Sequence, residues 1–407
     1  MTVTLHDIQE AAALLAGKLV RTPLVPAVGL GEELGIDLHL KLENLQRAGS
    51  FKSRGAYVRM SRLPASATVN GVIAMSAGNH AQGVAFVARE LGIPATIVMP
   101  ENTPFMKVER TRRYGARVLL KGETLSESAT FAQELAEAEN LTFVHPYDDP
   151  DIVAGQGTLA LEMLADDPTL EVLVVPVGGG GLIAGIATAA KALKPDIEII
   201  GVEAALYPSM YEALHGRTPT SGGQTLAEGI AVKTPGALPL EIVRQHVSDI
   251  LLVDESAIER AVQQLVENQK IVAEGAGAAG IAALLAYPER FRGRRTGVVI
   301  CGGNIDTRML SSVLLRGLAR DGKLVRIRSE ISDSPGVLAK IAGLIGDCGG
   351  NIVEIYHQRL FYNVPVKLAE LDAVIETRTP DHVREIVERL NRAGFPTRLL
   401  GGATPDE

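Results

Sequence analysis

The sequence predicts an α/β protein of two lobes followed by a smaller βαββαβ module. Short apolar runs rich in β-branched residues alternate with helix-length segments between about residues 38 and 300. This alternation is typical of parallel strands joined by right-handed crossovers. It occurs in two sets, one before about Pro150 and one after about Gly157, so we expect two lobes with a ligand-binding cleft between them.

The first lobe follows an N-terminal helix, expected over about residues 6–19 with Thr4 as its N-cap. A strand at 38–42 leads directly into the segment around Lys52. The other elements expected before Pro150 are strands at 71–75, 95–99 and 117–120 and helices at 81–91 and 103–114.

The second set alternates in the same way. Its expected strands lie at 172–177, 197–202, 250–253 and 298–300, and its expected helices at 182–193, 255–268 and 275–286. We expect both sets to form one domain, residues 1–319, in which a small lobe of about residues 51–150 is inserted into the larger lobe.

The character of the sequence changes at the short charged turn 320–323. The elements expected beyond it are strands at 324–331, 351–358, 369–377 and 396–400 and helices at 337–348 and 380–393. This order is that of the split βαβ, ferredoxin-like unit, so residues 324–402 are predicted to form a separate module.

The composition excludes several classes of protein. A net charge of −8 argues against a nucleic-acid partner and against binding to anionic membranes. The two cysteines, Cys301 and Cys348, are too few for a disulfide framework or a four-ligand zinc site. The N-terminus lacks the pattern of a signal peptide, and no apolar run reaches the roughly 18–20 residues that span a bilayer. The expected location is the cytoplasm.

The stretch GSFKSRGA, residues 49–56, places Lys52 near the start of a predicted helix. An ammonium group kept from water has a lowered pKa and can condense with an aldehyde. Taken alone, the stretch is more simply explained as a solvated basic loop, because lysine is rarely buried.

Four consecutive glycines, residues 178–181, follow a predicted strand and open a predicted helix. Glycine lets the backbone approach an anion, and a helix N-terminus supplies unpaired N–H groups, so we expect a phosphate to bind here. Gly179, Gly181 and Ala184 also satisfy the pattern G-x-G-x-x-A, and Glu203 ends the next strand. A dinucleotide site is therefore an alternative interpretation.

The segment Ser76-Ala77-Gly78-Asn79-His80 is a second strand-to-helix turn rich in hydrogen-bond donors. Such a turn can hold a carboxylate, although a helix start capped by Ser or Asn explains it as well. Cys301 ends the last strand of the domain, at the edge where α/β sites lie. Pyridoxal phosphate would use all four features. They are a lysine, a phosphate-binding turn, a turn that can hold a carboxylate and a small polar residue at a strand end.

Six separated stretches resemble one family in the family's order. They are GSFKSRGA, MSAGNHAQGVA, PVGGGGLIAG, TLAEGIAV, AEGAGA and ICGGNID. Together they are similar to the serine/threonine dehydratases with the two-lobed tryptophan-synthase-β-like pyridoxal-phosphate fold, fold type II. Residues from Leu324 onward resemble a single ACT domain, as in catabolic-type threonine dehydratases with one regulatory domain.

The resemblance implies a threonine ammonia-lyase. Such an enzyme eliminates water from L-threonine, and less well from L-serine, to give 2-oxobutanoate or pyruvate and ammonia. By resemblance, Lys52 would hold the cofactor and remove the α-proton of the substrate. The cofactor would also contact Phe51, Asn79, Gly178, Gly179, Gly180, Gly181, Leu182 and Cys301. The substrate carboxylate would contact Ser76, Ala77, Gly78, Asn79 and His80.

At two positions the sequence departs from its relatives, which limits the properties of the family that can be expected here. Serine racemases of this group have a second serine at the position of Ala77, so dehydration alone is expected. They also bind a divalent ion through an acid at the position that Ser209 occupies here, so no divalent metal is expected. Cys301 would face the pyridine nitrogen, where many relatives carry serine, and a neutral partner leaves that nitrogen largely unprotonated.

The ACT resemblance implies an amino-acid effector, plausibly isoleucine or valine, bound between two copies in a homodimer or homotetramer. The expected effector contacts are Asp333, Ser334, Pro335, Gly336 and Asn351. Three alternatives remain: a related enzyme acting on 3-hydroxyaspartate or serine or catalysing β-replacement, a nicotinamide dehydrogenase, and a non-catalytic amino-acid sensor.

Overall fold

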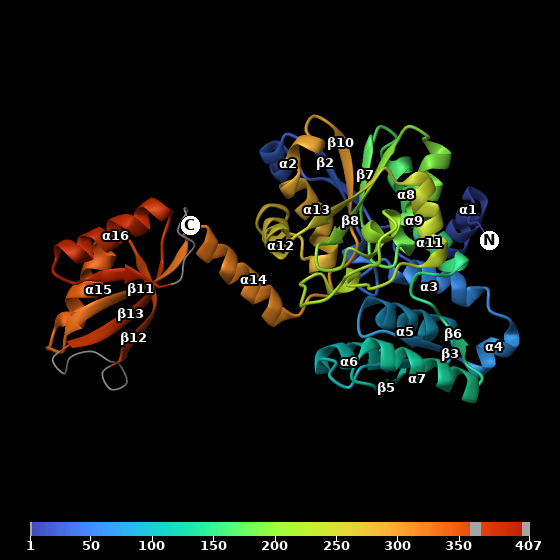
Figure 1. Ribbon diagram of the computed structural model, residues 1–407, viewed down its shortest axis with the longest axis horizontal. Coiled ribbons are helices and arrows are strands. Elements are labelled where there is room, and N and C mark those ends of the chain that lie inside the picture. The colour runs from blue at the N-terminus through green and yellow to red at the C-terminus, as the bar shows by residue number, and fades with distance from the viewer. Residues whose placement is uncertain (1, 359–367, 401–407) are drawn as a thin grey trace. The chain divides into compact units, whose positions relative to one another are not determined.

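The computed structural model describes residues 2–358 and 368–400 (Figure 1). The chain divides into two compact units, Met1–Ile305 and Asp306–Glu407. The division falls before helix α14 (Thr307–Arg320), whereas the sequence predicts a boundary after this helix. Within the described ranges, no helix is both long and apolar enough to span a bilayer.

The first unit contains a six-stranded sheet with the order β1-β2-β10-β7-β8-β9. The edge pair β1/β2 is antiparallel, and the other neighbours are parallel. The strands are β1 (Leu24–Pro26), β2 (Asp37–Leu42), β7 (Val172–Pro176), β8 (Glu198–Ala204), β9 (Asp249–Val253) and β10 (Arg295–Ile300). The inner strands are almost wholly apolar, as expected for parallel strands with both faces covered.

Helices cover this sheet on both sides. They are α1 (Leu5–Leu15), α2 (Val28–Leu34), α8 (Pro150–Asp166), α9 (Gly181–Leu193), α10 (Ser209–Leu214), α11 (Ala237–His246), α12 (Glu255–Gln269) and α13 (Gly275–Ala286). Single 3₁₀ turns lie at η1 (Glu43–Leu45), η2 (Glu228–Ile230) and η3 (Pro288–Arg290). A Cβ atom on Gly280 would lie 2.5 Å from Val298, so the small residues of α13 let it pack directly on β10.

A second, fully parallel sheet with the order β5-β4-β3-β6 is formed by the part of the sequence between β2 and β7. Its strands are β3 (Val72–Met75), β4 (Ala95–Met99), β5 (Arg117–Leu120) and β6 (Thr142–Phe143). The accompanying helices are α3 (Lys52–Ser61), α4 (Ala65–Asn70), α5 (Asn79–Leu91), α6 (Phe105–Arg112) and α7 (Leu125–Ala138). Helices α5 and α7 both pack against β3 and β4 (Figure 1). The predicted α/β class and the inserted small lobe are therefore present.

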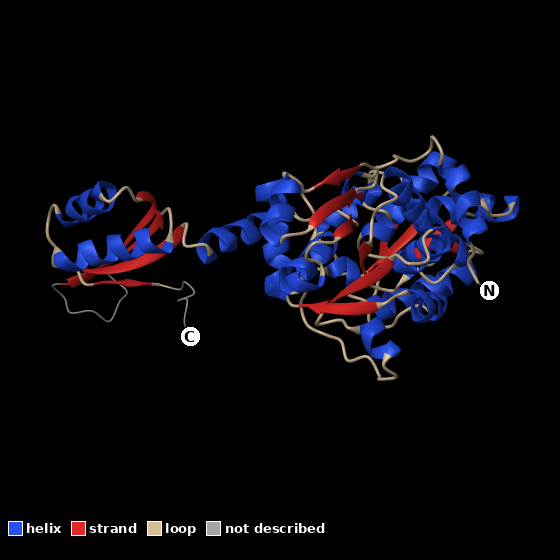
Figure 2. Ribbon diagram, turned by 90° about the horizontal axis from the view of Figure 1, so that it is seen from above, coloured by secondary structure: helices blue, strands red, loops and turns tan. Residues whose placement is uncertain are grey.

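The second unit continues from α14 into a four-stranded antiparallel sheet with the order β12-β13-β11-β14. Its elements are β11 (Leu324–Ser332), α15 (Val337–Asp347), β12 (Asn351–Gln358), β13 (Leu368–Glu376), α16 (Pro380–Arg392) and β14 (Thr397–Leu399). Figure 2 shows α15 and α16 on one side of this sheet. Their isoleucines Ile341, Ile345 and Ile386 form its core with strand residues such as Ile327. The predicted βαββαβ order is confirmed.

Candidate active site

Lys52 is the first residue of α3, so the prediction of a lysine near the helix start holds, although it does not lie a full turn inside the helix. Its Nζ donates to the carbonyl oxygen of Pro146 over 2.8 Å. Burial lowers the pKa of this amine to about 8, against the smaller opposing effects of Cys301 and Glu274. The solvated-loop explanation is therefore wrong, and a nucleophilic amine is available near neutral pH.

A buried ion network holds the helix that carries Lys52. The guanidinium of Arg54 contacts the carboxylates of Glu43 and Glu162, at distances from 2.6 to 3.0 Å. The Nζ of Lys41 contacts the same Glu162 over 2.6 Å. Because Glu162 lies on α8, the network joins α3 to the large lobe.

The glycine turn connects β7 to α9 as the sequence predicts. Gly180 has φ +93°, a left-handed conformation that favours glycine. A Cβ on Gly179 would fall 2.2 Å from the ring of Tyr147, and one on Gly181 would fall 2.9 Å from the Tyr147 carbonyl oxygen. In the part of the chain that the structure describes, the N–H groups of Gly178 to Leu182 have no protein acceptor. This set of free donors at a helix start suits a phosphate.

The segment 145–148 connects the glycine turn to Lys52. Pro146 accepts the hydrogen bond from Lys52, and the neighbouring Tyr147 packs on Gly179. Asp148 accepts hydrogen bonds from the N–H groups of Ala237 and Leu238, both at 3.0 Å, and so caps α11. Lys52 and the glycine turn are thereby held in one connected structure.

The carboxylate nest lies in the turn between β3 and α5. The N-cap of α5 is Gly78, with no side-chain cap, so capping by Ser or Asn does not explain this turn. The Oγ of Ser76 accepts from the N–H of Gly78 over 3.2 Å. The ring of His80 is turned to the carbonyl oxygen of Val144, 2.9 Å away, and burial lowers its pKa to about 3. His80 is thus a neutral, packed histidine, and only its backbone can serve the nest.

The side chain of Asn79 lies in a polar cluster at the end of β10. Its Nδ2 donates to the carboxylate of Glu274, and its Oδ1 accepts from Asn304 over 2.7 Å. Burial raises the pKa of Glu274 to about 7. Cys301 is buried beside this cluster, which raises the pKa of its thiol and keeps it neutral, and its carbonyl oxygen accepts from the N–H of Phe51 over 3.1 Å.

Four residues of this site carried no role in the sequence analysis: Pro146, Tyr147, Glu274 and Asn304. Glu274 and Asn304 lie within the stretches AEGAGA and ICGGNID, so the resemblance contained them without assigning a contact. Pro146 and Tyr147 had no sequence signal, because their contacts are to residues far away in the chain.

Glu203 does not face a ribose, as a dinucleotide site would require. Its carboxylate is fully buried and accepts from the N–H groups of Met210 and Tyr211, over 2.8 and 2.9 Å, at the start of α10. The Oγ of Ser209 lies 3.4 Å from the same carboxylate. Among the described residues, no group of three or more His, Cys, Asp or Glu could hold a metal ion.

The predicted effector residues do not meet within one copy of the chain. Asp333, Ser334, Pro335 and Gly336 follow the end of β11, whereas Asn351 opens β12. In the sheet, Asn351 pairs with Glu376, as does Leu324 at the opposite end of β11. Asn351 therefore lies at the opposite end of the strands from the 333–336 turn.

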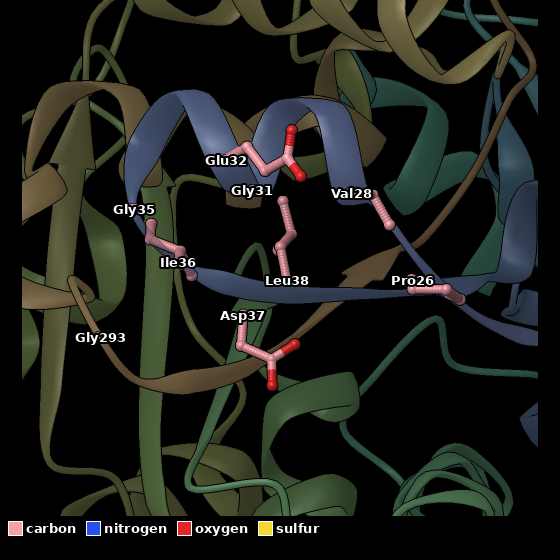
Figure 3. Close-up of a pocket in the computed structure, with 9 residues that line it drawn as sticks. All are labelled: Pro26, Val28, Gly31, Glu32, Gly35, Ile36, Asp37, Leu38 and Gly293. Carbon is pink, nitrogen blue, oxygen red and sulfur yellow. The ribbon is translucent and has the colours of Figure 1, made fainter.

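A hollow of about 360 Å³ lies apart from this site, between α2 and β2 (Figure 3). Its lining is mainly apolar, with the carboxylates of Glu32 and Asp37 pointing away from one another. Asp37 is already paired with Arg295 over 2.8 Å. None of the predicted site residues lines this hollow.

Residues 15–302 match the family described as pyridoxal-phosphate dependent enzymes. The chain belongs to this family. It is 43% identical to the L-threonine ammonia-lyase of Thermotoga maritima, over 98% of this chain and 100% of that protein. Threonine deaminase isoform 2 of Solanum lycopersicum is 35% identical with a TM-score of 0.72, covering 77% of this chain and 89% of its own. Maize serine racemase is 32% identical with a TM-score of 0.73, covering 78% of this chain and 98% of its own.

The site fits the cofactor of the family. Lys52 offers a buried amine, and the turn from Gly178 to Leu182 offers free N–H groups to a phosphate. Asn79 retains one N–H of its Nδ2 beyond the bond to Glu274, because an amide nitrogen carries two hydrogens. The amine can condense with the aldehyde of pyridoxal phosphate, the turn N–H groups can bind its phosphate, and the remaining Asn79 N–H can bind its hydroxyl.

Proposed function

We propose that this chain is a pyridoxal-phosphate-dependent threonine ammonia-lyase that converts L-threonine to 2-oxobutanoate and ammonia, and L-serine to pyruvate and ammonia. The observation that carries the proposal is the partly buried amine of Lys52, joined through Pro146 and Tyr147 to a glycine turn with free N–H donors. Two relatives named L-threonine ammonia-lyase and threonine deaminase support the choice of substrate.

When bound, the cofactor supplies an electron sink that acidifies the α-proton and favours departure of the β-hydroxyl. Lys52 is the residue that would hold it. With a pKa of about 8, roughly a tenth of the Lys52 amine is neutral at pH 7, so Nζ can accept the α-proton.

Other residues bind and orient. The backbone N–H groups of the turn from Ser76 to His80 would hold the substrate carboxylate, since their helix start is not capped by a side chain. The neutral thiol of Cys301 would face the ring nitrogen, where it does not favour the protonated form as a carboxylate would.

The reaction is tested by incubating the purified protein with L-threonine, L-serine and 3-hydroxyaspartate. We expect 2-oxobutanoate and ammonia in equal amounts from threonine, a slower release of pyruvate from serine, and little D-serine, since Ala77 replaces the second serine of racemases. Faster turnover of 3-hydroxyaspartate would replace the threonine assignment with the alternative substrate. No turnover of any of the three would favour the non-catalytic sensor.

The C-terminal module is proposed to be an ACT domain that regulates the enzyme. Its βαββαβ order and the alignment of the Thermotoga relative along its full length support this proposal. Because the turn 333–336 and Asn351 lie at opposite ends of the strands, an effector that contacts both requires two copies, in a homodimer or homotetramer. The cytoplasm remains the predicted location.

The effector is sought by measuring the reaction rate and the melting temperature with saturating isoleucine or valine. We expect a change in at least one of them, which the double substitution Asp333→Ala/Asn351→Ala should abolish. If both quantities stay unchanged with either amino acid, the proposed regulation by these effectors is rejected.

A further inference from the structure

The orientation of the Asn79 amide is determined by the residues on either side of it. Asn304 uses its Nδ2 to donate to two oxygens, the backbone carbonyl of Ala48 at 2.9 Å and Oδ1 of Asn79 at 2.7 Å. A carbonyl oxygen can only accept, so the donor end of Asn304 must face this way. The acceptor end of Asn79 must then face Asn304.

The other end of the Asn79 amide meets a matching acceptor. Its Nδ2 donates to Glu274, whose own N–H is fixed by the carbonyl oxygen of Gly302 over 3.1 Å. Turning the Asn79 amide by 180° would set its Nδ2 against the donor of Asn304 and its Oδ1 against the carboxylate of Glu274. The two neighbours therefore oppose that turn together.

Glycines leave the space that this arrangement needs. A Cβ on Gly302 would lie 2.3 Å from the Glu274 carboxylate and 3.1 Å from the Asn79 Nδ2. A Cβ on Gly49 would lie 2.5 Å from the Oδ1 of Asn304. The three polar side chains come from α5, from the N-cap of α13 and from the segment after β10, so the cluster joins the small lobe to the large one.

We propose that Glu274 and Asn304 are positioning residues that fix the orientation of the Asn79 amide. The second N–H of the Asn79 Nδ2 is then kept for the hydroxyl oxygen on the cofactor ring. The inference rests on the proposed contact between Asn79 and the cofactor. Glu274 and Asn304 act through Asn79 in this role, and neither needs to touch the cofactor.

Two substitutions of Asn304 separate orientation from packing. Asn304→Asp keeps the size of the side chain but replaces the donor with an acceptor, which favours the turned amide of Asn79. Asn304→Ala removes more atoms but leaves Glu274 to hold the amide in place. A purely structural role predicts the larger effect for Ala, whereas the orientation role predicts it for Asp.

The measurement is the dissociation constant of pyridoxal phosphate for the full-length apo protein, titrated by absorbance at about 410–420 nm, alongside the apo melting temperature. We expect Asn304→Asp to weaken binding about tenfold or more, and Asn304→Ala by a smaller factor, at comparable melting temperatures. Asn44→Asp is the matched control and should leave the constant unchanged, since among the described residues the Asn44 Nδ2 donates only to the carbonyl oxygen of Val272, over 3.0 Å.

A second set of variants covers the case in which Asn304→Asp does not fold. Glu274→Gln keeps an acceptor oxygen for Asn79 and should bind the cofactor nearly as the parent does. Glu274→Ala leaves Asn304 to hold the amide and should weaken binding by a small factor, whereas the double variant Glu274→Ala/Asn304→Ala, which leaves the amide unheld, should weaken binding about tenfold. Equal binding by the double variant and the parent, or a larger loss in Asn304→Ala than in Asn304→Asp, would overturn the proposal. Asn79→Ala separates the failure of the positioning role from the failure of the contact between Asn79 and the cofactor. If Asn79→Ala also binds the cofactor normally, that contact is rejected as well.

Discussion

The guanidinium of Arg54 donates to both oxygens of the Glu43 carboxylate, over 2.9 and 2.8 Å, in a site where both side chains are almost fully buried. Arg54 lies two residues after Lys52 on the same helix, and its remaining donor groups reach Glu162 on α8. The position of the reactive lysine therefore depends on a charge network that is mostly buried.

Replacing Arg54 with methionine should destabilise the protein by about 3–5 kcal/mol, because the buried carboxylate of Glu43 loses its charged partner and Glu162 keeps only Lys41. Urea unfolding followed by circular dichroism measures the loss. Arg62→Met is the matched control, since Arg62 ends the same helix but pairs with Asp151 and Glu10 at the surface. It should cost less than about 1 kcal/mol. Similar losses in both variants would contradict a buried network.

The rate at which the apo protein takes up pyridoxal phosphate should rise with pH and level off above about pH 8. The reacting species is the neutral amine of Lys52, and its pKa of about 8 lies below the ordinary 10.5, so the neutral fraction grows tenfold per pH unit below pH 8. Growth of the band at about 410–420 nm after mixing gives the rate. Lys52→Arg should show no band at any pH. A rate still rising steeply at pH 10 would mean that the lysine is not desolvated.

Gly179→Ala should weaken the binding of pyridoxal phosphate by about tenfold or more. The added Cβ would overlap the ring of Tyr147, so either this ring or the turn that presents the N–H donors must move. Equilibrium titration of the apo protein measures the effect. Gly29→Ala, which adds a methyl group to α2 where no atom lies within 4 Å, should bind the cofactor normally. Normal binding by both variants would show that the turn does not hold the phosphate.

Glu203 should make the stability of the protein depend on pH. Burial raises the pKa of Glu203 to about 7 from 4.5, so the folded protein holds this proton more tightly than the unfolded chain does. The resulting stabilisation is complete below about pH 4.5 and is lost as the pH rises through 7. Relative to Glu203→Gln, the parent should lose about 3 kcal/mol between these pH values. The free energy of unfolding is measured in urea at several pH values for both proteins. The same dependence on pH in both would contradict this prediction.

The strands could be predicted closely because buried parallel strands are continuous apolar runs. The bounds of β4 and β5 match their predictions, as do those of α13. The first helix was predicted to extend to residue 19, but it ends at Leu15, shortly before Gly17 adopts a left-handed φ of +70°. Helix α8 was missed because residues 152–160 are all buried, which removes the amphipathic period that marks a surface helix. Its start was nonetheless encoded, by the Asp149 cap and Pro150.

The candidate site was predictable as segments but not as contacts. Lys52, the glycine turn and the turn before α5 each carry a local signal, because each lies at the start of a helix. The bond between Asn79 and Glu274 joins residues 195 positions apart and carries no local signal. For the same reason the packing of His80 against Val144, which removes its ring from the nest, could not be read from the sequence.

The order of strands in the large sheet has a consequence for synthesis on the ribosome. Strand β10 is the last strand of the first unit to be made, yet it lies between β2 and β7 at the middle of the sheet. A nascent chain that stops before residue 295 has β2 and β7 without the neighbour that joins them. The small sheet, which is continuous in sequence from β3 to β6, can pair its strands long before that point. Until β10 emerges, β2 and β7 each keep one edge unpaired, and Cys301, which follows β10, is not yet in place beside Phe51 and Lys52.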